Sequence, residues 1–388
     1  MRRYVFVKRA AIGLLLGAAI LMSACGATKG PGSLAAKNSA TLSATTSATP
    51  SAIVGPRSGG LFAVLRARGL GSSPNARDFV VIAGPDGYGR ARATFSPRHI
   101  PVLAQCCGGL LTETEAHVAD GAVYFIDGSG VVRRLTPAGS TSVAATFGLS
   151  ANQLISFAVS PDGRKLMAAV LTIPTGNDPL ILDLQLATDN GPPTRLQHLV
   201  AKQGYDLVNI QLVDWDAEGP IAVVGGPFGA EHGLLDGQRW FGGHLARLDL
   251  NGVVGQPLGG SDCVPYALPL AGRVICSESL REGGFHISVR SLAGQVIWNG
   301  PSAITVDQGY LAISPDGSRL AMRGSVQSFD GTKIPLPADF LPTGWLDPKT
   351  LIGALAASRT FQEMGILRLD ALDKVQDWGF AGEFVGTL

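Results

Sequence analysis

The residues of this sequence best suited to chemistry are its cysteines. Cys263 and Cys276 flank a segment whose centre, Pro269–Gly272, has the composition of a hairpin turn, so their sulfurs are placed to face each other across paired strands. Four cysteines allow three pairings, and we favour a Cys263–Cys276 disulfide. Cys106 and Cys107 then form a strained vicinal disulfide or stay free thiols. A metal site built on this adjacent pair is the alternative. Adjacent cysteines lack the C-x₂-C spacing of zinc ligands, so we expect neither metal nor cofactor.

No pattern in the sequence indicates a catalytic centre. The acidic run Asp214–Glu218 stops short of the ligand set of an EF-type calcium loop, and we interpret Asp214 and Asp216 as turn residues. Neither G-x-S-x-G nor H-E-x-x-H occurs, and the six histidines are scattered singly, which is typical of surface or hydrogen-bonded residues. The sequence therefore favours a protein that is not an enzyme. Carboxylates drawn from separate repeats leave no local motif, so a hydrolase or lyase acting on a saccharide is the alternative.

The elements that must position any site are short strands. With 51 Gly and 24 Pro, the chain favours tight turns over long helices. Runs of β-branched and aromatic residues predict strands over Phe79–Ala83, Ala122–Ile126, Leu180–Leu184 and Ile221–Val224. Turn residues that tolerate positive φ predict hairpins at Asp127–Gly130, Asn251–Gly252 and Ala293–Gly294. The sequence therefore predicts an all-β fold.

One strand-turn-strand unit is repeated. Phe157–Ala169 contains Ser-Pro-Asp-Gly between two apolar runs, and Tyr310–Met322 contains the same turn in the same setting. Weaker echoes occur at Ala83–Gly87, Val213–Gly219 and Gly344–Ile352. A small sheet cannot bury both faces alone, so repeated sheets must stack on one another.

The Ser-Pro-Asp-Gly hairpin resembles the WD40-like β-propeller repeat of periplasmic TolB-type proteins and many exported bacterial lipoproteins. The resemblance implies a β-propeller over residues 60–388, and a spacing of about 45 residues per blade gives seven blades, with six or eight compatible. The uneven spacing around Gly225–Trp240 indicates a loop insertion, and Trp240–Phe241 beside it is either a partner contact or the start of a strand. A pair of β-sandwiches is the alternative, but it does not explain a recurring turn.

The first 24 residues have the pattern of a secretory signal peptide. Arg2, Arg3, Lys8 and Arg9 precede an apolar run from Ala10 to Met22, which is too short to cross a bilayer comfortably. The sequence Leu21–Cys25 resembles the bacterial lipobox, which implies that Cys25 carries the lipid anchor after cleavage. We therefore expect an exported protein held at the extracytoplasmic face of the cell membrane.

Residues 25–59 read as a flexible tether, because they are rich in Ser, Thr, Ala, Gly and Pro and contain no aromatic residue. Loss of the four basic residues of the signal peptide, which has no acidic residue, lowers the net charge from +1 to −3. Nucleic-acid binding needs clustered Lys and Arg, so we expect no nucleic-acid partner. The function expected from the sequence is a membrane-anchored propeller that binds or scaffolds a protein, a peptide or an envelope glycan.

Overall fold

The structure is a computed structural model, and it describes residues 60–66, 78–96, 116–173, 179–189, 191–201, 210–225, 243–267, 269–279, 285–300, 311–355 and 363–388. The predictions for the signal peptide, Cys25, the tether, Cys106, Cys107 and Trp240–Phe241 lie outside these residues, as does most of the predicted insertion. The described residues include no helix long and apolar enough to span a membrane.

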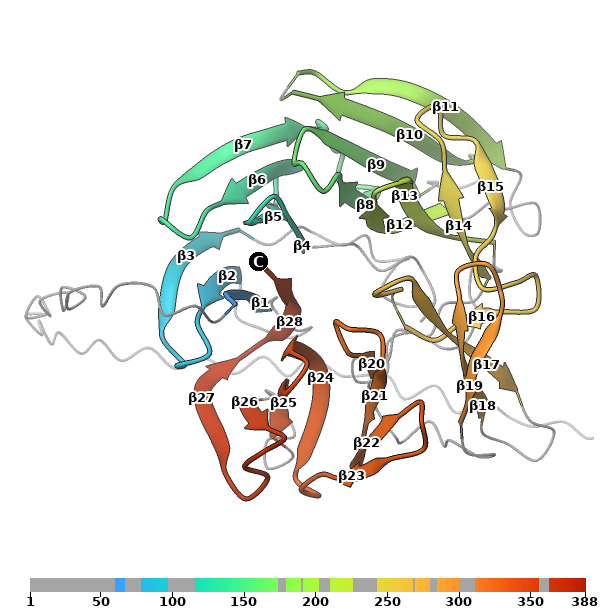
Figure 1. The fold of residues 1–388 in the computed structure, drawn as a ribbon. Coiled ribbons are helices and arrows are strands. Elements are labelled where there is room, and N and C mark those ends of the chain that lie inside the picture. The colour runs from blue at the N-terminus through green and yellow to red at the C-terminus, as the bar shows by residue number, and fades with distance from the viewer. Residues whose placement is uncertain are drawn as a thin grey trace, which may run out of the picture. The chain divides into compact units, whose positions relative to one another are not determined.

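The described strands form seven four-stranded antiparallel sheets, numbered here as blades (Figure 1). Blade 1 is built from β28 (Glu383–Thr387), β1 (Phe62–Arg66), β2 (Asp78–Ala83) and β3 (Gly89–Phe95). Blade 2 contains β4 (Ala116–Ala119), β5 (Ala122–Ile126), β6 (Val131–Leu135) and β7 (Thr141–Thr146). Blade 3 contains β8 (Gln153–Val159), β9 (Lys165–Thr172), β10 (Leu180–Thr188) and β11 (Thr194–Ala201).

The remaining four blades follow the same order along the chain. Blade 4 contains β12 (Ile210–Asp216), β13 (Gly219–Val224), β14 (His244–Leu248) and β15 (Val254–Pro257). Blade 5 contains β16 (Val264–Pro265), β17 (Arg273–Ser279), β18 (Phe285–Ser291) and β19 (Val296–Asn299). Blade 6 contains β20 (Ala312–Ile313), β21 (Arg319–Met322), β22 (Ser325–Ser328) and β23 (Lys333–Pro335). Blade 7 contains β24 (Phe340–Asp347), β25 (Thr350–Leu355), β26 (Glu363–Arg368) and β27 (Val375–Ala381).

Buried side chains pack between consecutive blades, and this packing closes the ring. The described residues contain seven hydrophobic clusters, and each joins two neighbouring blades, including one between blade 7 and blade 1. The protein is therefore a seven-bladed β-propeller, as the repeat predicted, and the sandwich alternative is wrong. Because both faces of a blade are covered, central strands such as β5 are buried along their whole length.

Blade 1 is completed by the two ends of the described chain. Its first position is taken by β28, which pairs antiparallel with β1 in the register Phe62↔Thr387 and Ala63↔Gly386. Phe384 packs against the cluster that blade 1 shares with blade 7. Val385 and Leu388 pack against the cluster shared with blade 2. Pairing of β28 with β1 therefore fastens the ring, so that blades 1 and 7 cover the sheet faces that a linear array of blades would leave exposed.

The two Ser-Pro-Asp-Gly segments have matching hydrogen bonds. In the first, the Ser160 hydroxyl donates to the Asp162 carboxylate at 2.6 Å and accepts the Lys165 N–H at 2.9 Å. In the second, Ser314 makes the corresponding bonds to Asp316 at 2.5 Å and to the Arg319 N–H at 2.9 Å. The segments join the first and second strands of blades 3 and 6. The echo at Ala83–Gly87 joins β2 to β3 instead, so it is a similar turn at a different place in the blade.

The aspartates of the two Ser-Pro-Asp-Gly turns should make the stability of the protein depend on pH in the acid range. Hydrogen bonds from Ser160 and from the Arg164 N–H lower the pKa of Asp162. Burial opposes ionisation of Asp316, but hydrogen bonds from Ser314 and Ser318 outweigh it, and its pKa is also lowered. As the pH falls, these carboxylates therefore take up protons at a higher pH in the unfolded chain than in the folded one. The stability that they contribute is present above the ordinary carboxyl pKa of 3.8 and is lost as the pH falls below it. We expect the urea midpoint to drop steeply between about pH 4 and pH 2. Asp162→Asn should flatten this slope, and the exposed control Asp339→Asn should not.

Ala271, in the turn between β16 and β17, has a backbone conformation that is unfavourable for alanine. Leu270 and Arg273 exchange two backbone hydrogen bonds, of 3.0 and 2.9 Å, and enclose Ala271 and Gly272 with φ of 52° and 70°. Positive φ at both central positions defines a type I′ turn, which favours Asn before Gly, whereas left-handed alanine is strained. Ala271→Asn should therefore raise the free energy of unfolding by about 0.5–1 kcal/mol. Ala138→Asn, in another tight turn but at negative φ, is the matched control, and an equal effect of both would contradict this explanation.

Candidate functional site

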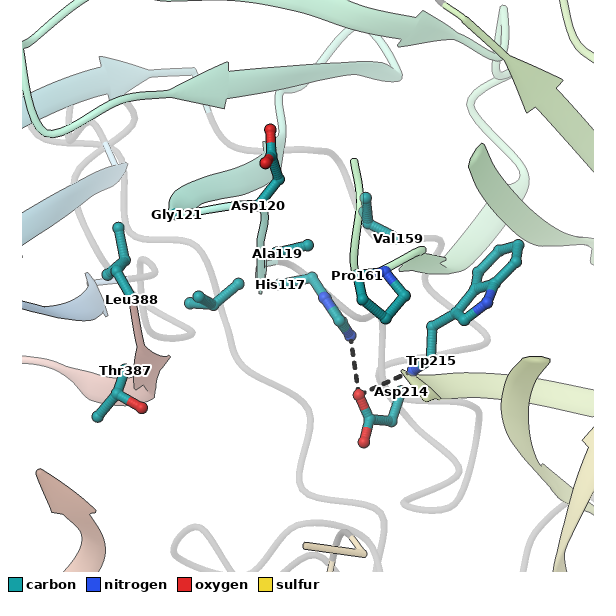
Figure 2. A pocket seen from close by; sticks show the side chains of 11 residues that line it. His117, Ala119, Asp120, Gly121, Val159, Pro161, Asp214, Trp215, Thr387 and Leu388 are labelled. Atoms are coloured by element: carbon teal, nitrogen blue, oxygen red, sulfur yellow. Dashed lines mark hydrogen bonds and ion pairs between the residues drawn. The ribbon is translucent and has the colours of Figure 1, made fainter. Parts of the chain in front are cut away.

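A pocket of about 220 Å³ opens where the carboxyl ends of four first strands meet (Figure 2). These strands are β4, β8, β12 and β28, from blades 2, 3, 4 and 1. Its lining mixes apolar residues, among them Val118, Val159, Pro161 and Leu388, with the polar residues His117, Asp120, Asp214 and Thr387. Figure 2 shows the His117 ring pointing toward Asp214, with Pro161 and Val159 beside it. The pocket thus combines an apolar wall with a few polar groups, as ligand sites do.

The central feature of the pocket is an imidazole–carboxylate pair that joins blade 2 to blade 4. His117 Nε2 lies 3.4 Å from Asp214 Oδ1, and the same oxygen accepts the Trp215 N–H at 2.8 Å. The His117 side chain is 11% exposed and that of Asp214 is 33% exposed, so only the carboxylate faces solvent substantially. His117 Nδ1 is buried and has no hydrogen-bond partner among the described residues. The pair therefore fixes the ring at one nitrogen and leaves the other unsatisfied.

A β-bulge in β12 accounts for the orientation of Asp214. The register between β12 and β13 shifts between Leu212 and Asp214. Leu212 and Trp215 both pack into the cluster between blades 3 and 4, which the strict alternation of a regular strand does not allow. The buried Ser156 hydroxyl of β8 accepts the Leu212 N–H at 2.9 Å and ties the bulged strand to blade 3. Bulges commonly redirect a side chain next to a functional site, and here Asp214 is aimed into the pocket.

The other carboxylates near the pocket are neutralised by arginines. Asp120 lies in a two-residue turn between β4 and β5 and pairs with Arg134 at 2.9 Å. Its backbone N–H donates to Pro161 O at 3.2 Å, which ties blade 2 to blade 3. Burial raises the pKa of Asp216, but hydrogen bonds from Arg247 and from the Glu218 and Gly219 N–H groups outweigh it and lower that pKa. Asp216 is therefore a structural ion-pair and turn residue.

The interpretation of Asp214 and Asp216 as turn residues is right for Asp216 only. Asp216 is the last residue of β12, and its Oδ1 accepts the N–H groups of Glu218 and Gly219 in the turn that follows. Asp214 lies two residues before the end of the strand and lines the pocket. His117 was set aside as one of six scattered histidines. Neither residue stands in a local motif, and only the fold brings them together.

The cysteines named from the sequence lie away from this pocket. Cys263 and Cys276 are bonded to each other in the structure, with their Cα atoms 5.0 Å apart. Both are 2% exposed and belong to the cluster between blades 4 and 5, next to Val274. The hairpin turn expected at Pro269–Gly272 is the one that contains Ala271 and Gly272. No group of three or more His, Cys, Asp or Glu side chains suited to a metal occurs among the described residues.

No family model and no curated protein matches the sequence. Among solved structures, the chain is similar to the Dos1 propeller, with 12% identity, TM-score 0.45 and coverage of 79% of this chain and 82% of that one. It is also similar to the Cps50 (Swd1) β-propeller domain from Myceliophteria thermophila, with 14% identity, TM-score 0.37 and coverage of 71% and 90%. An oligogalacturonate lyase in complex with manganese has 12% identity, TM-score 0.42 and coverage of 63% and 73%. These similarities concern the propeller fold, and no function is transferred from them.

Proposed function

We propose that this chain is an exported lipoprotein of the TolB-like kind, anchored through Cys25, whose propeller binds a protein, a peptide or an envelope glycan. The signal pattern before Cys25 and the tether composition support the anchor. The observation that carries the binding role is the pocket built on His117 and Asp214 from two different blades. Residues held at one end of a rigid ring present a preorganised surface to a ligand.

The anchor is tested by metabolic labelling with an alkyne analogue of palmitate. The chain as expressed should enter the membrane fraction and carry the label, and Cys25→Ser should abolish both because the acylated sulfur is gone. Cys106→Ser is the matched control and should leave labelling unchanged. Label retained in Cys25→Ser would overturn lipidation at this position.

The binding role is tested by blocking the pocket from its open side. Thr387 is exposed and lines the pocket, so Thr387→Trp should fill it with little effect on the core. Thr141→Trp places the same side chain at an exposed position on β7, away from the pocket. The full chain, purified in detergent, is titrated with envelope peptides and glycan fragments. Binding that is lost in Thr387→Trp and kept in Thr141→Trp supports the proposal, and binding unaffected by either variant contradicts it.

An enzymatic role is the second candidate, and the Asp214 carboxylate that faces the pocket is what favours it. A carboxylate that reaches a bound sugar can act as general acid or base, so a saccharide hydrolase or lyase would use Asp214 in that role. In such an enzyme Asp214→Asn lowers kcat by about 10²–10⁴-fold. Release of sugar fragments from envelope polysaccharides that depends on Asp214 would replace the binding module by this candidate.

A further inference from the structure

One oxygen of the Asp214 carboxylate is available to a ligand. Oδ1 lies 3.4 Å from His117 Nε2 and accepts the Trp215 N–H at 2.8 Å. Oδ2 accepts no hydrogen bond from any described residue, and the side chain keeps 33% of its surface exposed within the pocket lining. An ionised carboxylate has capacity for about four hydrogen bonds, so this side chain is under-used in the structure.

The His117 ring is held beside Asp214 at a cost in stability. Its Nε2 faces the Asp214 carboxylate at 3.4 Å, so this is the ring nitrogen placed to interact with the carboxylate. The buried Nδ1 is then left without a partner among the described residues. An unsatisfied buried polar atom costs about 1–3 kcal/mol, and its position beside a pocket marks a place where function outweighs stability. The pair therefore holds the Asp214 carboxylate in a fixed orientation at that cost.

Asp214 and Asp120, the two aspartates that line the pocket, differ in their cationic partners. Asp120 has a guanidinium partner, Arg134, at 2.9 Å. Among the described residues, the ion pairs of Asp214 include His117 and neither a lysine nor an arginine. A partly enclosed carboxylate without a permanent cation favours a positively charged ligand, because the low dielectric around it strengthens the attraction.

The pocket is small and open to solvent, so it suits one group of a larger ligand. Val118, Val159, Pro161 and Leu388 supply apolar surface around the carboxylate. The volume of about 220 Å³ is below the range of about 300–1,000 Å³ typical of sites for whole drug-sized ligands. An alkyl chain with a charged head suits both features, since its stem packs on apolar surface while the head reaches the carboxylate.

We infer that this pocket is a subsite for a cationic amine, of the class formed by a lysine side chain of a peptide or protein ligand, with Asp214 as the residue that receives the ammonium group. The inference rests on the proposed binding function and narrows its ligand from protein, peptide or glycan to a basic polypeptide. Asp214 is the contact residue, and His117 is the positioning residue that orients its carboxylate.

The test uses n-butylammonium, its neutral counterpart 1-butanol, and a short lysine peptide with and without acetylation of the lysine. Calorimetric titration of the full chain in detergent should show millimolar binding of the two amines and at least tenfold weaker binding of the neutral probes. Asp214→Asn should weaken amine binding at least tenfold. Asp120→Asn makes the same charge change in the same pocket and should alter it less than twofold, because Arg134 already neutralises Asp120.

The outcomes distinguish this inference from the function on which it depends. Equal binding of butanol and butylammonium, or equal effects of the two Asn variants, would overturn the amine subsite. If a neutral glycan fragment binds and Thr387→Trp blocks it while the amines do not bind, the binding function stands and the amine subsite falls. If ligands bind equally to the wild type and to Thr387→Trp, the pocket itself is the wrong site.

Discussion

Deletion of Glu383–Leu388 is expected to abolish the folded propeller. These residues hold β28, which fills the first position of blade 1 and pairs with β1. Without them, Phe384, Val385 and Leu388 are lost from the clusters that join blade 1 to blades 7 and 2. These three side chains are partly buried, so each contributes less than a fully buried apolar side chain, whose contribution is about 1.5–3 kcal/mol. Their loss together with the pairing of β28 to β1 still removes a large share of a domain stability of about 5–15 kcal/mol.

The contact between β28 and blade 7 is especially close. A Cβ added at Gly344 would overlap the Phe384 ring, so glycine is needed where β24 meets β28. Urea unfolding followed by tryptophan fluorescence measures the effect of the deletion, and deletion of residues 41–46, in the segment predicted to be a tether, is a control of equal length. A synthetic peptide covering residues 381–388 should restore folding in trans. An unchanged urea midpoint in the truncated chain would show that the ring does not need β28.

Loss of the Cys263–Cys276 disulfide is expected to lower the free energy of unfolding by roughly 3 kcal/mol, because it closes a loop of sequence separation 13 and so restricts the unfolded chain. Both cysteines are buried, so the double variant Cys263→Ala/Cys276→Ala is preferable to serine, which would bury an unsatisfied hydroxyl. Urea unfolding with and without dithiothreitol measures the loss. Reduction should destabilise the wild type and leave the double variant unchanged.

The comparison with the reductant also tests the compartment. A stable disulfide fits an exported protein, because cytosolic thiols are kept reduced. The wild-type chain should therefore be isolated under thiol-blocking conditions. Alkylation of both cysteines, together with a urea midpoint that reductant does not change, would contradict the disulfide. It would also remove one argument for export.

The fold was predictable because its signals are local. Ala122–Ile126 coincides with β5, and the Asp127–Gly130, Asn251–Gly252 and Ala293–Gly294 turns all join consecutive strands of one blade. Turn chemistry acts within four residues, so the sequence contains it directly. The place of β28 was not predictable, because its pairing with β1 joins opposite ends of the propeller and leaves no local pattern.

The candidate site escaped prediction for the same physical reason. His117 and Asp214 belong to different blades, and their contact depends on the closed ring and on the bulge between Leu212 and Asp214. A side chain redirected by a bulge departs from the alternation on which strand patterns rest. The one available signal was the carboxylate run Asp214–Glu218 at the end of β12, whose aspartates were interpreted as turn residues. Lipidation at Cys25 and the state of Cys106 and Cys107 remain predictions from the sequence.

The binding site itself is tested most directly by the NMR spectrum of the full chain with ¹⁵N-labelled histidine side chains, recorded at pH 8. The His117 signals are assigned by their absence in His117→Gln. We expect hydrogen on Nε2 and none on Nδ1, because Nε2 faces the Asp214 carboxylate. These signals should shift when n-butylammonium is added and stay in place with 1-butanol. Hydrogen on Nδ1, or signals unmoved by every ligand that the protein binds, would contradict a binding site built on His117 and Asp214.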